Sequence, residues 1–114
     1  MKKIIAIALL LAFVAGAGAL FAQQQRLRNG TFTGTGEGYL GEMTVTVTVA
    51  RNRISAITVT ESADTAAFVT MVTTQMVPAM IQAQSAQVDL VTGATATSEA
   101  LVQAVEEALT RARR

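Results

Sequence analysis

The sequence of 114 residues contains no cysteine and no histidine. Without cysteine, the chain has no disulfide, no c-type haem attachment, no thiolate-bound metal and no lipoprotein anchor. Without histidine, it lacks the commonest metal ligand and the usual general base. Chemistry beyond simple binding therefore has to come from a cofactor.

The N-terminal segment, residues 1–22, has the three-part layout of a secretory signal peptide. It begins with a short basic region that contains Lys2 and Lys3, and Ile4 to Ala22 is apolar. Small residues mark two candidate cleavage points, after Ala19 and after Ala22. The apolar run is also just long enough to span a bilayer, which takes about 20 apolar residues. The sequence therefore predicts export to the periplasm or another extracytoplasmic site, with the segment either cleaved or retained as an anchor.

The rest of the chain is long enough for one small domain and no more. Both lysines lie within the signal segment, so seven arginines face eight acidic residues in the remainder. The arginines are scattered at both ends and in one turn of the sequence. This nearly neutral balance, without a basic stripe, predicts no nucleic-acid binding.

The first half of this domain has the period of β-strands. Gly30 to Gly41 alternates threonine and glycine, which is typical of an edge strand passing into a turn. Met43 to Val49 alternates apolar residues with threonines, and Ile54 to Thr60 returns after a turn in which Asn52 is expected to be left-handed. One apolar face in each strand predicts an antiparallel sheet covered on one side only.

Helical spacing replaces the strand period at about Thr65. Asp64 or Thr65 is the predicted cap, and Pro78 is predicted to begin a second short helix that ends near Gln84. A closing helix is predicted from Thr97 to Arg111. The expected apolar face of the first helix consists of Phe68, Met71, Val72 and Met76. The fold class is therefore α+β, a small antiparallel sheet covered on one face by helices and preceded by an N-terminal signal segment.

A stretch rich in hydroxyl residues, Asp89 to Ser98, precedes the closing helix. Val88 to Val91 is predicted to be a short strand, Gly93 to form a tight turn, and the threonines and serine to crowd the helix start. A helix N-terminus offers unpaired N–H groups and a positive dipole end, which suits a phosphate. Threonine and serine are also ordinary capping residues, so both interpretations follow from these residues.

The pattern Asp-x-x-Thr-Gly-Ala-Thr, from Asp89 to Thr95, resembles the flavinylation motif of the FMN-binding domain family. This family includes the covalently flavinylated subunits of sodium-pumping NADH:quinone reductase and of the Rnf electron-transport complex. The resemblance extends over residues 29–113, including the hairpin and the final helix. It implies that Thr95 carries FMN through a phosphoester bond, which a flavin transferase makes from FAD. The signature around the acceptor consists of Asp89, Thr92, Gly93 and Ala94.

Four further residues are expected to bind the cofactor. Thr97 and Ser98 are hydroxyls that would cap the helix or bond to the phosphate. Gly38 and Tyr39 lie in a Thr-Gly-x-Gly-x-Gly-Tyr segment that resembles the strand walling the flavin in this family. Relatives often have a Glu-Thr-Pro-Gly-like loop after the return strand, whereas this chain has Asp-Thr-Ala-Ala at residues 64–67.

The function implied by the resemblance is that of an exported flavoprotein carrying electrons between redox partner proteins, with membrane-bound proteins among the candidates. The flavin transferase is the other expected partner, and no nucleic acid is expected. The chain has no plausible acid–base pair for catalysis, which is compatible with a carrier that is not itself an enzyme. Two alternatives stay open: a module of a flavin-dependent reductase, and a non-redox exported binding domain.

Overall fold

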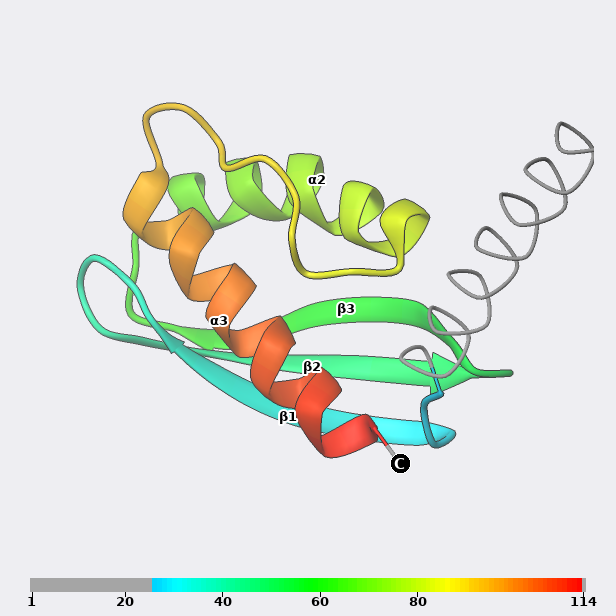
Figure 1. The fold of residues 1–114 in the computed structure, drawn as a ribbon. Coiled ribbons are helices and arrows are strands. Elements are labelled where there is room, and N and C mark those ends of the chain that lie inside the picture. The colour runs from blue at the N-terminus through cyan, green and yellow to red at the C-terminus, as the bar shows by residue number, and fades with distance from the viewer. Residues whose placement is uncertain (1–25, 114) are drawn as a thin grey trace, which may run out of the picture.

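The computed structural model describes residues 26–113, a three-stranded antiparallel sheet with two helices on one face (Figure 1). The signal segment predicted at residues 1–22 lies outside the described residues. The sheet order is β1-β2-β3, so β2 lies in the middle and β1 and β3 are the edge strands. In chain order the elements are β1 (Gly30–Glu37), β2 (Glu42–Ala50), β3 (Arg53–Ser62), α2 (Ala66–Ala83) and α3 (Thr95–Ala112).

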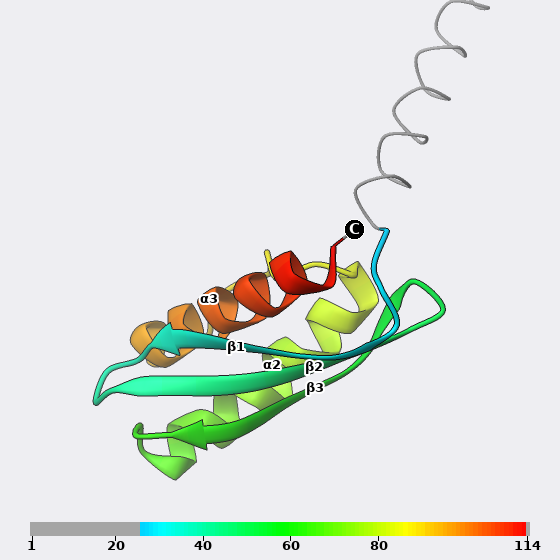
Figure 2. The ribbon, with the colours of Figure 1, turned by 90° about the horizontal axis from the view of Figure 1, so that it is seen from below.

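Both helices lie on the same side of the sheet, and no described helix covers the other side (Figure 2). The apolar residues of β2 face the helices and are at least 98% buried: Met43, Val45, Val47 and Val49. The threonines between them are half-buried on the open face. The predicted α+β fold with a sheet covered on one face is therefore confirmed.

The β2–β3 hairpin closes through a turn in which Arg51 has φ 55° and Asn52 has φ 63°. Two successive left-handed residues are the geometry of the two-residue turns that match the twist of a hairpin. The left-handed conformation predicted for Asn52 is confirmed, and Arg51 shares it. This turn places two arginine positions at the end of the sheet remote from the β1–β2 turn.

Helix α3 packs directly on β1 because two glycines of the strand have no side chain. A Cβ on Gly34 would lie 1.9 Å from the carbonyl oxygen of Ala104, and one on Gly36 would lie 2.1 Å from that of Ala100. Small residues on the helix complete this close approach, since Ala100, Ala104 and Ala108 are fully buried. The group that approaches these two glycines is therefore a helix.

Helix α2 is continuous from Ala66 to Ala83 and contains Pro78 in its interior. The prediction of a second helix beginning at Pro78 is wrong. Proline removes one backbone hydrogen bond and favours a break. Here the apolar face runs on across it, with Val72, Met76 and Met80 fully buried. This packing outweighs the local preference.

The connection between α2 and α3 has no regular secondary structure, so the strand predicted at Val88–Val91 is wrong. No described strand lies beside it to pair with it. Instead, Ala86 and Val91 insert into the core and anchor the connection. Its backbone passes α2 and loops round at the left before it reaches the start of α3 (Figure 1).

Candidate functional site

A half-open cavity of about 390 Å³ lies at the end of the molecule where the β1–β2 turn meets the first turns of α2 and α3. In Figure 1 this is the left-hand end. Small-molecule sites commonly have volumes of roughly 300–1,000 Å³. The cavity is lined by Tyr39, Leu40, Asp64, Thr65, Phe68, Gly93, Ala94, Thr95, Ala96 and Thr97.

The polar side of the cavity is the uncapped N-terminus of α3. Thr95 is the first helical residue and is exposed. The N-cap residue is Ala94, and no side chain forms a cap hydrogen bond at this helix end. The first N–H groups of such a helix have no intrahelical partner, and the helix dipole favours negative charge there. Gly93 makes the turn with φ 88° and has no atom within 4 Å of a Cβ position. An anion can therefore reach the helix end beside the Thr95 hydroxyl.

The next two hydroxyl residues, Thr97 and Ser98, form hydrogen bonds with other segments of the chain. Thr97 is 3% exposed and donates to Asp64 Oδ2 at 2.7 Å, while Ser98 is fully buried and accepts a hydrogen bond from the Val91 N–H at 3.0 Å. The expectation that one of them caps α3 is wrong, because both side chains bond to other segments. Thr95 is the hydroxyl of this stretch that is both exposed and part of the cavity lining.

Asp64 joins the three segments that form the cavity. Its Oδ1 accepts the Leu40 N–H at 2.7 Å, and its Oδ2 accepts the Tyr39 N–H at 3.1 Å and the Thr97 hydroxyl at 2.7 Å. Of the two predicted caps, Asp64 and Thr65, it is Thr65 that occupies the N-cap position of α2, although it forms no side-chain cap hydrogen bond. The carboxylate instead holds the β1–β2 turn against the first turn of α3.

Burial of the Asp64 carboxyl acts to raise its pKa, but the hydrogen bonds from Thr97, Leu40 and Tyr39 outweigh burial and lower the pKa below its ordinary value of 3.8. Bonds that favour the charged form stabilise the folded state wherever that form is present. Asp64 therefore contributes its full stabilisation above its ordinary pKa and loses it as the pH falls through the lower, folded-state pKa.

We expect Asp64→Asn to lower the free energy of unfolding at pH 7 by about 1–3 kcal/mol, because an amide cannot accept all three bonds. Urea denaturation from pH 7 down to pH 3 measures the effect. The gap between the parent and the variant should narrow as the pH falls below 4, where the parent carboxylate begins to protonate. Glu61→Gln, an exposed change on β3, is the matched control. A gap that stays constant over this range would contradict the role given to the charge.

The other side of the cavity is apolar and open to solvent. Tyr39 is 78% exposed and Phe68 is 44% exposed, with Leu40 exposed beside them. The prediction that Phe68 belongs to the core face of its helix is wrong, because its side chain lines the cavity. Three large apolar side chains gathered at one cavity suit a flat apolar ligand more than free exposure to water.

The structure separates the predicted site residues into two groups. Tyr39, Thr97 and the three residues 93–95 line the cavity, but Thr92, Ser98, Gly38 and Asp89 do not. Gly38 supports the site indirectly, since a Cβ there would lie 2.5 Å from Asp64 Oδ2. Asp89 lies beside α2, in a separate hollow.

Sequence reasoning missed Asp64, Leu40 and Phe68 as site residues. The signal for Asp64 was its place in the loop where relatives carry a glutamate, and the signal for Leu40 was its position next to Tyr39. Among residues 26–113 no group of three or more acidic side chains could hold a metal ion. The arrangement can therefore hold an anionic group at the helix end and a flat apolar group against the exposed side chains.

The chain is similar to a known family and to a protein of known sequence. A family model described as FMN-binding domain matches residues 38–110, a range that includes every residue lining the cavity. An uncharacterized protein of Treponema pallidum (strain Nichols) is 34% identical over 83 residues. That similarity covers 73% of this chain and 23% of the relative, so the chain spans less than a quarter of the length of this curated relative.

Proposed function

This chain belongs to the FMN-binding domain family, and we propose that it is an exported flavoprotein that holds FMN covalently and carries electrons between redox partners. One observation carries the proposal. Thr95, the last threonine of the Thr-Gly-Ala-Thr motif, is exposed in a cavity that joins an uncapped helix N-terminus to an apolar wall.

The residues present fit FMN at both of its ends. The phosphate is anionic and suits the unpaired N–H groups at the start of α3. The isoalloxazine is flat and largely apolar, and it suits the exposed side chains of Tyr39, Leu40 and Phe68. The Asp64 carboxylate already accepts three hydrogen bonds, so it competes less with the phosphate for the N–H groups at the start of α3.

The covalent attachment we propose is a phosphoryl transfer carried out by a separate flavin transferase. The Thr95 hydroxyl oxygen forms a new bond to the phosphorus on the FMN side of FAD. The anhydride bond between the two phosphates breaks, AMP leaves, and the hydroxyl proton passes to a base of the transferase. No electron is gained or lost in this step.

Bound FMN supplies transfer of one or two electrons, and this chain supplies position and surroundings. The ester oxygen of Thr95 fixes the phosphate, the helix end stabilises its charge, and the apolar side chains exclude water from one side. Outside the cytoplasm a covalent bond also prevents loss of the cofactor by diffusion. The absence of histidine and cysteine from the chain is compatible with a carrier.

The test is to express the full chain with and without a flavin transferase and to examine the denatured protein for bound flavin. We expect yellow colour that survives denaturation only with the transferase, and reversible bleaching when the native protein is reduced and reoxidised. Absence of covalent flavin after co-expression would favour the non-redox binding domain. Steady turnover of a small organic acceptor by the purified flavoprotein would favour the reductase module.

A further inference from the structure

The fold gathers the arginines at the end of the molecule opposite the cavity. They come from three segments that are distant in sequence: the residues before β1, the β2–β3 turn and the end of α3. In both ribbon views these segments lie together at the right-hand end (Figures 1 and 2). We call this the arginine end, and it consists of Arg26, Arg28, Arg51, Arg53, Arg111 and Arg113, all of them exposed.

Hydrogen bonds fix these three segments against one another. The Leu27 N–H donates to Asn52 Oδ1 at 2.5 Å, which joins the segment before β1 to the hairpin turn. The Arg28 N–H donates to the Ala112 carbonyl at 2.7 Å, and Leu27 forms an isolated β-bridge with Arg113. The arginine end is therefore a built surface, although its residues are scattered in the sequence.

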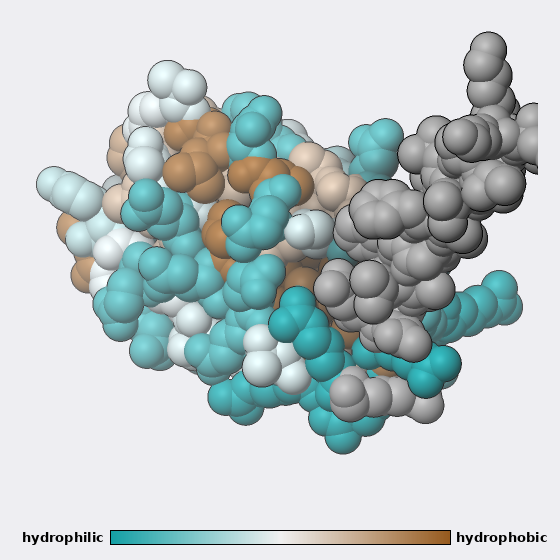
Figure 3. Space-filling model, in the orientation of Figure 1, coloured by the Kyte–Doolittle hydropathy of each residue, from teal (hydrophilic) through white to brown (hydrophobic). Residues whose placement is uncertain are grey.

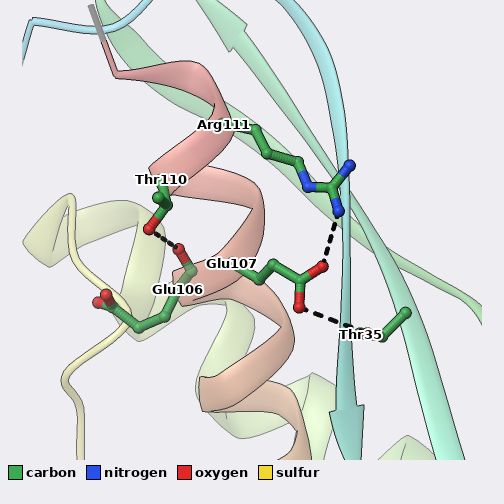
Figure 4. Close-up of polar contacts among 5 residues, drawn as sticks. All are labelled: Thr35, Glu106, Glu107, Thr110 and Arg111. Carbon is green, nitrogen blue, oxygen red and sulfur yellow. Dashed lines mark hydrogen bonds and ion pairs between the residues drawn. The ribbon is translucent and has the colours of Figure 1, made fainter.

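Most of its positive charge has no acidic partner among residues 26–113. Arg111 pairs with Glu107 at 3.0 Å, and Glu107 also accepts a hydrogen bond from Thr35 on β1 (Figure 4). Arg113 lies 4.0 Å from Glu106. Arg28 donates to a backbone carbonyl and lies over the Phe32 ring, and neither contact neutralises it. The described salt bridges include none of the remaining three, Arg26, Arg51 and Arg53.

Apart from Glu106 and Glu107, which pair with two of these arginines, acidic residues lie mainly toward the other end, near the cavity. Glu37 and Glu42 are opposite each other beside the β1–β2 turn, and Glu61 lies near the end of β3, three residues before Asp64. Glu99 lies close to the start of α3. The domain is thus electrically polarised along its length. In Figure 3 the larger groups of visible hydrophobic side chains lie toward the upper left and centre of the coloured surface.

We propose that the arginine end is a docking surface for anionic lipid headgroups and that it orients the cavity away from the membrane. Guanidinium groups bind phosphates through paired hydrogen bonds, and basic residues at an anionic bilayer act together. The chain reaches this end at Arg26, directly after the 25 residues that contain the apolar run Ile4–Ala22. Positive charge suits either a lipid surface or a soluble polyanion, and the apolar run that precedes Arg26 favours the lipid surface.

The test uses the full chain and two labelling positions on one strand. Ala50 lies at the arginine end of β2 and Glu42 lies at its other end, about 26 Å apart for eight residues of strand. Because the sequence has no cysteine, Ala50→Cys and Glu42→Cys each give one site for a fluorophore. The vesicles carry a headgroup-attached quencher and contain phosphatidylcholine, with or without phosphatidylglycerol.

We expect the label at position 50 to be quenched more than the label at position 42, only with phosphatidylglycerol and less at high salt. Combining Arg26→Gln, Arg51→Gln and Arg53→Gln should remove the difference and lower the preference for anionic over neutral vesicles roughly 10- to 100-fold. The control combines Glu37→Gln with Glu61→Gln at the cavity end and should keep the orientation. Thermal unfolding checks that each variant is folded.

Equal quenching at the two positions would overturn the proposal. So would an arginine variant that behaves like the parent, or quenching that does not depend on phosphatidylglycerol. Binding of the parent to a soluble polyanion such as heparin in preference to anionic vesicles would also overturn it and assign the surface to another partner.

Discussion

Thr95→Ala, co-expressed with a flavin transferase, is expected to carry no covalent flavin and to remain folded. The substitution removes the oxygen that would form the phosphoester, so the loss should be complete rather than partial. The Thr95 side chain is exposed and makes no hydrogen bond among the described contacts, so the free energy of unfolding should change by no more than about 0.5 kcal/mol. Intact mass and thermal unfolding measure the two effects separately.

Thr92→Ala and Thr97→Ala are the matched controls for the acceptor. Thr92 is exposed but does not line the cavity, whereas Thr97 lines the cavity but is bonded to Asp64. Both variants should keep the covalent flavin, and Thr97→Ala should lose about 1 kcal/mol of stability with its hydrogen bond. Covalent flavin in Thr95→Ala, or its loss only in Thr97→Ala, would show that the acceptor is wrongly assigned.

Gly34→Val is expected to be the most destabilising change outside the site. Its Cβ would lie 1.9 Å from the Ala104 carbonyl oxygen and 2.7 Å from the Ala108 nitrogen, and both of these are backbone atoms of α3. A backbone cannot move aside as a flexible side chain can, so the helix must shift away from the strand. Overpacking typically costs about 1–3 kcal/mol, and we expect at least the upper value.

A loss of about 3 kcal/mol lowers the melting temperature of a domain of this size by roughly 12–24 °C. Thr33→Val is the control, because Thr33 precedes Gly34 on β1 but is exposed on the open face of the sheet. It keeps a β-branched side chain and should change stability by no more than about 0.5 kcal/mol. Equal melting temperatures for Gly34→Val and the parent would contradict the close packing of α3 on β1.

The parts of the fold that depend on local pattern could be predicted from the sequence. The alternation from Met43 to Val49 gave a strand with one buried face, and the spacing of Leu101 and Val105 gave the buried face of α3. The resemblance to the FMN-binding domain family, based on the motif that ends at Thr95, is confirmed by the family match over residues 38–110. Each of these signals is contained in a short stretch of chain.

The errors arise where contacts between distant segments decide the structure. Pro78 remains inside α2 because buried methionines on both sides of it pack on the sheet. Phe68 has helical spacing, yet its side chain is 44% exposed and lines the cavity. The role of Asp64 requires a turn 24 residues before it and a hydroxyl 33 residues after it to lie together. The periodicity of one helix or strand carries no information about such contacts between segments that are distant in sequence.

The arginines illustrate the same limit. In the sequence they appear at two ends and one turn, which argued against a basic surface. Antiparallel pairing brings the start of β1 beside the end of β2. The residue after α3, Arg113, pairs with Leu27 just before β1, so the end of α3 lies at the same place. Three separate groups of charge thus become one surface.

The central claim is that Thr95 is the residue to which FMN is attached, and peptide mass spectrometry tests it most directly. The full chain is co-expressed with a flavin transferase, digested, and the modified peptide is fragmented to locate the added mass. We expect one FMN less one water on the Thr95 oxygen and on no other residue. An unmodified Thr95 in a protein that carries covalent flavin, with the mass on Thr92, Thr97 or Ser98, would contradict the account.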